Sequence, residues 1–138
     1  MSEFSKTTFY ERAMLNQLFS KMPFSVPDTL YLALCTADPG ADGDTTSEIS
    51  DPAYARQPIS SWTAAQKHSS GSGSYVQNVL DVDFPASSID WGRVYFGVLL
   101  DAATGGNAYY KGAFDVAEEI LARGVFHLPA GEIQVLEG

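Results

Sequence analysis

The sequence contains very little cysteine: Cys35 is the only one among 138 residues. A lone cysteine cannot form an intramolecular disulfide, so nothing indicates an oxidising compartment. No apolar run approaches the roughly 18 residues of a membrane helix, and residues 1–6 lack the apolar stretch of a signal peptide. We therefore expect a protein that is made in the cytoplasm of its host and does not enter a membrane.

The sequence is also poor in positive charge. It has 8 Lys and Arg against 17 Asp and Glu, a net charge of −9, and only 18% of its residues are charged. An acidic surface repels phosphate backbones and anionic lipids, which argues against nucleic acid and membrane as partners. The low charged fraction leaves a more neutral surface than usual and suggests contacts with other subunits. The length fits one domain over residues 1–138.

Groups suited to catalysis or metal binding are scarce. The two histidines, His68 and His127, lie far apart in the sequence and match no metal or nucleophile motif. Cys35 lies in an apolar segment and is predicted to be a small buried residue. The acidic loop residues Asp38, Asp42, Asp44 and Glu48 raise the alternative of a calcium site, but their spacing does not match the known loop and a solvated loop is favoured. We predict no catalytic residue, cofactor or metal.

Residues 8–22 form the one segment with helical periodicity. Apolar residues recur there at spacings of three and four, Thr7 or Thr8 can cap the start with Glu11 as the capping-box partner, and Pro23 ends the segment. The favoured interpretation is that this helix packs on the core of its own domain. The alternative is that it docks against a neighbouring subunit.

From residue 29 onward the pattern alternates as in strands. Residues 117–123 have a helix-like composition but lie between strands, so a strand is favoured there. The sequence thus predicts a mainly β, single antiparallel β-sandwich or barrel-like domain of about seven or eight strands with a short N-terminal α-helix. The clearest strand segments are 29–36, 54–59, 75–84, 94–101, 108–116, 124–129 and 132–137.

Aromatic residues make up 12% of the chain. Tyrosine and tryptophan combine a large apolar area with a polar tip, which suits them to subunit interfaces, although core packing is the default role for most of them. Together with apolar residues of the helix, they give the following interface candidates: Phe9, Leu15, Phe19, Tyr54, Trp62, Trp91 and Tyr109.

Several short motifs follow one another in a familiar order. They are LYLALCTADPG at 30–40, YARQ at 54–57, VDFP at 82–85, DWG at 90–92, DAATGGN at 101–107 and PAGEIQV at 129–135. This series resembles a family of small tailed-bacteriophage virion proteins commonly labelled phage tail fibre proteins, and it covers nearly the whole chain. The sequence departs from the family pattern at residues 116–123. The resemblance implies a structural component of the virion that is present in several copies, and it supplies no catalytic residues.

The leading hypothesis is therefore a non-enzymatic structural component of a tailed-phage particle, associated with the tail fibre or baseplate, that acts through subunit contacts. Its partners would be other phage virion proteins and further copies of itself, with a trimer as one candidate symmetry. Two alternatives stay open: a capsid decoration (cement) protein, and a carbohydrate- or receptor-binding module that presents Trp62 or Trp91 to a glycan. The long repeats of a fibre shaft are absent, which favours a fibre base, adaptor or cap.

Overall fold

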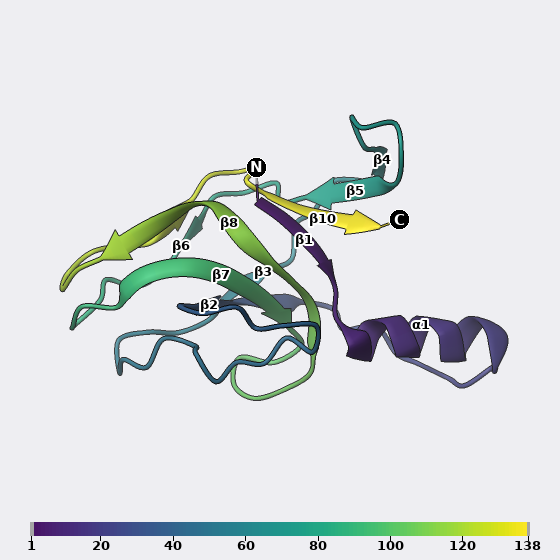
Figure 1. Ribbon diagram of the computed structural model, residues 1–138, viewed down its shortest axis with the longest axis horizontal. Helices are drawn as coiled ribbons and strands as arrows, with labels where there is room; N and C mark the ends of the chain where they lie inside the picture. The colour runs from purple at the N-terminus through teal and green to yellow at the C-terminus, as the bar shows by residue number, and fades with distance from the viewer. Residues whose placement is uncertain (1, 138) are drawn as a thin grey trace.

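The structure is a computed structural model that describes residues 2–137, and it is built mainly of β-strands (Figure 1). One α-helix follows the first strand, and the remaining strands come after it. In chain order the elements are β1 (Ser2–Lys6), α1 (Thr8–Phe19), β2 (Leu30–Cys35), β3 (Gln57–Ile59), β4 (Gln66–Lys67), β5 (Ser74–Gln77), β6 (Val82–Asp83), β7 (Gly92–Leu100), β8 (Ala108–Ile120), β9 (His127–Leu128) and β10 (Ile133–Glu137).

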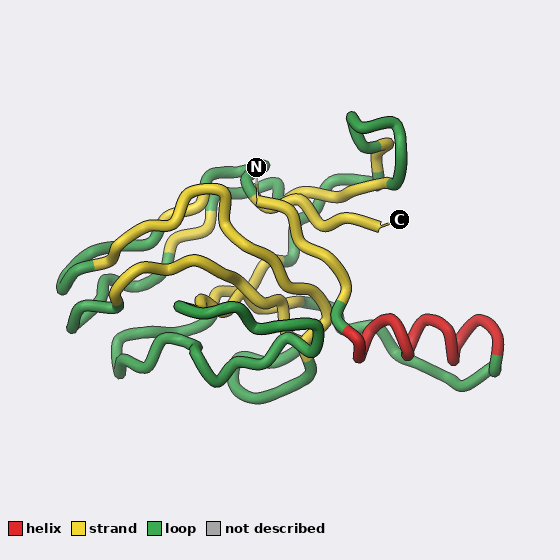
Figure 2. Tube along the Cα trace, viewed as in Figure 1, coloured by secondary structure: helices red, strands yellow, loops and turns green. Residues whose placement is uncertain are grey.

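Eight strands form one curled sheet in the order β3-β2-β7-β8-β1-β10-β5-β4, and β6 pairs separately with β9. Figure 2 shows the strands of this curled sheet in yellow. The sheet bends into a half-barrel, and its pairs are antiparallel except for β1 with β10, which run parallel. The predicted fold class, a mainly β domain with one short helix, is confirmed. The predicted β7–β8 hairpin is also confirmed, since Leu99 pairs with Tyr110 across it.

The core lies on both faces of the sheet. Along β2, Leu32 and Leu34 belong to the main cluster, which also contains Phe4, and the alternate residue Ala33 faces a second, smaller cluster. This arrangement confirms the prediction of a strand covered on both faces, with Cys35 buried. The loop over residues 37–53 covers the second cluster. Gly43 has φ 69° there, and a Cβ atom at this position would lie 2.6 Å from the Cβ atom of Ala108.

The N-terminal strand β1 is an element that the sequence did not reveal, because strands were expected only from residue 29 onward. β1 runs between β8 and β10, with Phe4 opposite Gly112 on one side and Val135 on the other. Phe4 is 1% exposed and Ser2 is buried too. A single large apolar residue in five gives too short a pattern to identify a strand, and the stabilising neighbours come from the far end of the chain.

The expected strand over residues 75–84 is divided into β5 and β6, and Asn78 is the reason. It is 1% exposed, and while its backbone stays paired with Ile133 and Trp62, its side chain makes three further hydrogen bonds. The amide nitrogen donates to the carbonyls of Leu80 (2.8 Å) and Pro129 (3.2 Å), and the amide oxygen accepts from the backbone N–H of Ile133 (3.0 Å). A buried amide satisfied in this way fixes a bend in the chain.

The ends of two other elements also differ from expectation. The helix ends at Phe19 rather than at residue 22, since Lys21 has φ 56°, a left-handed conformation that stops a helix. In residues 117–123, the favoured strand is confirmed as far as Ile120, and a turn follows with Arg123 at φ 72°. Among the described residues, no helix is long and apolar enough to cross a membrane.

Candidate subunit interface

The most unusual feature of the structure is a helical arm that projects from one end of the sheet. We define the arm as α1 together with residues 20–26, which run back beside the helix toward the sheet (Figures 1 and 2). Not one residue of α1 is buried. The favoured sequence interpretation, a helix packed along its own core, is therefore wrong, because only the first turn meets the sheet.

Thr7 fixes the arm to the sheet. Its hydroxyl accepts a hydrogen bond from the backbone N–H of Tyr10 (3.3 Å) as the N-cap and donates to the carbonyl of Ala108 at the start of β8 (2.6 Å). The backbone N–H of Thr7 donates to the carbonyl of Tyr109 (2.9 Å), and the backbone N–H of Thr8 donates to the carbonyl of Ala41 in the covering loop (2.9 Å). Thr7 is 0% exposed. The helix thus leaves the sheet in a defined direction.

Aromatic rings pack around this base. Tyr109 of β8 lies at the centre, with ring centroids 5.1 Å from Tyr10, 5.4 Å from Phe9 and 6.1 Å from Phe24. Tyr110 also meets Tyr10, at 5.5 Å. Burial, and then the nearby carboxylate of Glu137, raise the pKa of the Tyr110 phenol, so that it stays protonated. Edge-on and tilted aromatic contacts of this kind stiffen the root of the arm.

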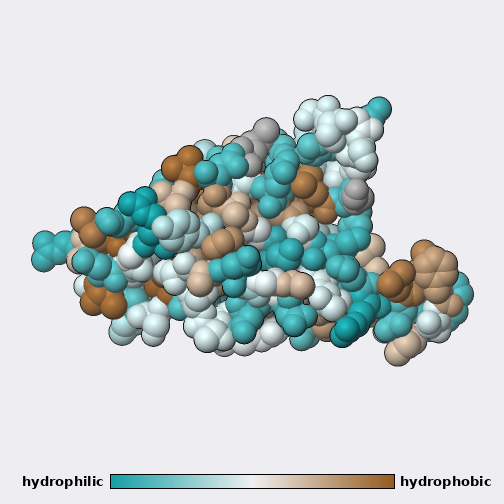
Figure 3. Space-filling view, viewed as in Figure 1, coloured by the Kyte–Doolittle hydropathy of each residue, from teal (hydrophilic) through white to brown (hydrophobic). Residues whose placement is uncertain are grey.

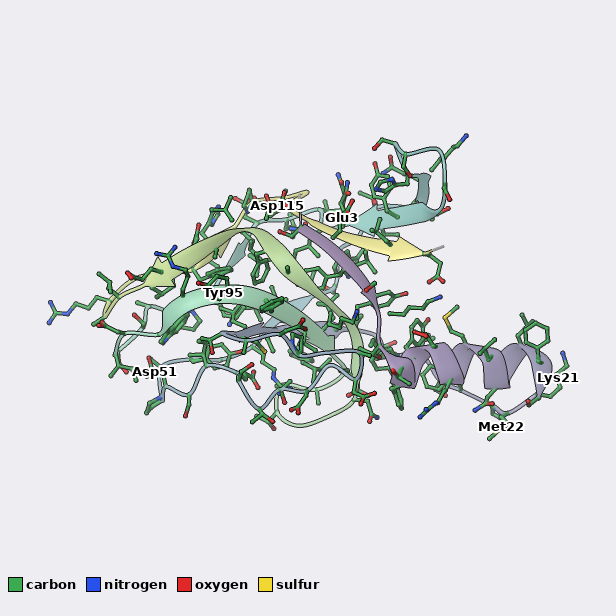
Figure 4. The ribbon with its side chains drawn as sticks, in the orientation of Figure 1. Glu3, Lys21, Met22, Asp51, Tyr95 and Asp115 are labelled. Atoms are coloured by element: carbon green, nitrogen blue, oxygen red, sulfur yellow. The ribbon has the colours of Figure 1, made fainter. Side chains whose placement is uncertain are left out.

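Beyond the root, the arm exposes apolar side chains to solvent. Leu18 is 62% and Phe19 73% exposed, and brown surface gathers on this part of the molecule in Figure 3. Met22 lies at the far end of the arm beside Lys21, as Figure 4 shows. An isolated helix of 12 residues is marginally stable in water and normally depends on packing of an apolar face. The exposed face is thus a candidate docking surface.

A groove of about 420 Å³ lies between the helix and its returning segment, and a second of about 460 Å³ lies on another side of the helix. The first is lined by the apolar residues Phe9, Ala13, Met22, Pro23 and Phe24 together with the polar residues Thr8, Arg12, Asn16 and Asp42. The second is lined by Met14, Leu15, Leu18 and Phe19, with Lys6 and Glu11 at its root. The arm therefore presents apolar surface on two sides.

Three of the seven interface candidates lie on the arm, namely Phe9, Leu15 and Phe19, and a fourth, Tyr109, supports its root. Trp91 is 7% exposed and donates its indole N–H to Asp51 (2.8 Å) inside the domain. Tyr54 and Trp62 are partly buried against the main core. The structure thus gathers four candidates at the arm and places the other three within or against the core.

Two polar clusters in the long loop were not recognised from the sequence. Asp51 accepts hydrogen bonds from the backbone N–H and hydroxyl of Ser88 and from Trp91, and these bonds, led by the Ser88 hydroxyl, hold the pKa of its carboxyl well below the usual range. Arg56 forms a bidentate ion pair with Glu48, in which Nε donates to Oε2 (2.8 Å) and Nη2 donates to Oε1 (2.9 Å). Asp51 was not recognised because its partners Ser88 and Trp91 lie 37 and 40 residues further along the chain. Glu48 and Arg56 are only eight residues apart, but neither lies in a helix or strand whose regular spacing would predict the contact.

The acidic loop residues that raised the calcium alternative are used mainly within the loop. Asp38 accepts from the backbone of Gly40, and Asp44 accepts from the backbone and hydroxyl of Thr46. Across residues 2–137, no group of three or more His, Cys, Asp or Glu side chains is placed to hold a metal ion. His127 is exposed and bonds to Asp83, which raises the pKa of its imidazole.

The chain matches, over residues 5–136, the family model described as podophage GP4 fiber I protein gp80. The chain belongs to this family. The match confirms the resemblance seen in the motifs and identifies the protein as a fibre-type structural component of a phage. It includes both the arm and the sheet, so the arm is part of the domain that the family shares. A search of curated proteins found no match.

Proposed function

We propose that this protein is a non-enzymatic subunit associated with the tail fibre or baseplate of the phage particle, and that the arm joins it to neighbouring virion proteins. The observation that carries the proposal is the arm itself: a helix with no buried residue, anchored firmly at one end and apolar on two sides. Such a projection in a fibre-family protein is suited to contacts with other subunits of the particle.

The anchoring of the arm supports a docking role over a loose extension. The hydroxyl bond from Thr7 to Ala108 and the rings around Tyr109 hold the first turn in place before any partner arrives. A partner would then meet a preorganised surface and would not have to order it, which lowers the entropic cost of association.

The sheet edges give less support to association through added strands. One edge is β3, a strand of three residues that contains Pro58, and the other is β4, with two residues. Proline and short length are the usual means by which edge strands avoid pairing with other chains. Contacts through side chains of the arm therefore fit this structure better than extension of the sheet.

The test compares two leucines of nearly equal exposure. Leu18, on the arm, is 62% exposed, and Leu80, outside the arm, is 64% exposed. We would supply Leu18→Asp or Leu80→Asp protein to phage that lack the wild-type gene and quantify the chain in purified particles by mass spectrometry. Covering one such leucine contributes about 1–2 kcal/mol, and a buried carboxylate adds a further penalty. We expect Leu18→Asp to lower incorporation at least about tenfold and Leu80→Asp to leave it unchanged.

Equal incorporation of the two variants would contradict the docking role of the arm. Electron microscopy of the same particles with a gold-labelled antibody against the chain distinguishes a location at the tail from a location on the head. Label at the tail supports the proposal, whereas label spread over the head would replace it with the capsid decoration alternative.

A further inference from the structure

Building on the proposed function, we propose that the arm has a second copy of this chain as its partner. In this arrangement the outer face of α1, defined as Glu11, Met14, Leu15, Leu18 and Phe19, packs against the same face of the other copy. The two helices run antiparallel about a two-fold axis that passes between Leu15 and Leu18.

The outer face has the spacing of a helix-packing surface. Its residues recur at intervals of three and four, which places them along one side of the helix. The returning segment lies on a different side, where the side-chain amide of Gln17 donates to the carbonyl of Phe24 (3.1 Å). The outer face is therefore left open along its length, with Leu15 58% exposed.

The charges that border this face are self-complementary when two helices run in opposite directions. Glu11 lies four residues before Leu15 on the helix, and the Lys21 ammonium group is held at the C-terminal end of the helix by its bond to the carbonyl of Leu18. Rotation about an axis between the two leucines sets Leu15 of one copy opposite Leu18 of the other and brings Glu11 near Lys21 twice, once at each end. A parallel arrangement would instead place Glu11 beside Glu11 and Lys21 beside Lys21.

These two charged groups are available for such contacts. Within residues 2–137, no ion pair is formed by the Glu11 carboxylate, and Lys21 donates only to the carbonyl of Leu18 at the end of its own helix (2.8 Å). A two-fold contact of this kind uses the same patch on both copies and closes after two subunits. The chain would thus enter the particle as pairs, or as larger rings built from pairs.

Charge exchange tests the arrangement. We would measure the molar mass of the purified chain by size-exclusion chromatography with light scattering over a concentration series, for wild type, Glu11→Lys, Lys21→Glu and the double variant. We expect a wild-type dimer, an apparent dissociation constant raised about tenfold or more in each single variant, and recovery to within about threefold in the double variant. Lys67→Glu, an exposed reversal on β4, is the matched control and should leave the dimer intact.

The double variant is decisive, because both changes oppose the helix dipole and would weaken α1 further if they acted only on the helix. Circular dichroism and thermal unfolding of all variants will verify that the sheet stays folded. A monomeric wild type, a trimer, or a double variant as weak as the single ones would overturn the two-fold pairing. If the two-fold pairing fails in this way but incorporation into particles still depends on Leu18, the proposed function stands, and the partner of the arm is a different virion protein.

Discussion

Removal of one hydroxyl group at the root of the arm should destabilise the protein measurably. Thr7→Val keeps the shape of the side chain but removes both the N-cap acceptor for Tyr10 and the buried donor to the Ala108 carbonyl. Loss of an N-cap costs about 1 kcal/mol, and loss of a buried hydrogen bond that leaves an acceptor without its donor costs about 1–2 kcal/mol. We therefore expect a decrease of roughly 2–3 kcal/mol in the free energy of unfolding, or about 8–12 °C in Tm.

Thr8→Val is the control, because its hydroxyl makes only a long, exposed contact to Ala41 (3.4 Å) and should cost less than about 0.5 kcal/mol. Urea unfolding gives the free energy, and hydrogen exchange reports whether the Tyr10 amide loses protection in the Thr7 variant. If Thr7→Val and Thr8→Val unfold alike, the arm is not anchored as the structure indicates.

The remaining predictions concern groups buried elsewhere. Arg56→Met leaves the half-buried Glu48 carboxylate without its ion-pair partner and should lower the free energy of unfolding, measured in urea, by roughly 3–5 kcal/mol. The exposed change Arg93→Met should lower it by less than about 0.5 kcal/mol. Equal decreases in the two variants would refute the role of the pair. Because the pKa of Asp51 is lowered by folding, its contribution to stability is complete above about pH 4 and decreases as pH falls below that value. Thermal unfolding from pH 2 to 6 should therefore show a weaker acid dependence in Asp51→Asn, and an unchanged profile would contradict this. Burial raises the pKa of Cys35 to about 11, so iodoacetamide at pH 8 should label the thiol only after unfolding, and fast labelling of the folded protein would show that it is exposed.

Much of the fold follows from local pattern. The alternation in β2 and the β7–β8 hairpin around residues 101–107 depend on neighbours in the sequence, and both were predicted correctly. The strand β1 was missed because its pairing partners, such as Val135, lie at the other end of the chain. Asn78 was recognised as an interruption of an apolar face, but only its contacts to the region around Ile133 show that it ends a strand.

The candidate interface was only partly predictable. Helical spacing identified residues 8–22 as an amphipathic helix that contains Phe9, Leu15 and Phe19, yet the same spacing is found in helices that cover their own core. What distinguishes the two cases is the direction in which Thr7 starts the helix, and this direction is set by bonds to Ala108, 101 residues away. Trp91 is the opposite case, because its large ring suits an interface, yet its indole N–H donates to Asp51 inside the protein and the ring is buried.

Cross-linking in assembled particles tests the central claim that the arm contacts other virion subunits. A photoreactive phenylalanine analogue would replace Phe19, which is 73% exposed on the arm, or Val116, which is 72% exposed on β8, as the matched control. After irradiation of purified particles, mass spectrometry would identify the attached peptides. We predict that position 19 joins the chain to a second polypeptide, either another copy or a neighbouring virion protein, more efficiently than position 116 does. Attachment of position 19 only to water, or only to residues of the same subunit, would contradict the account.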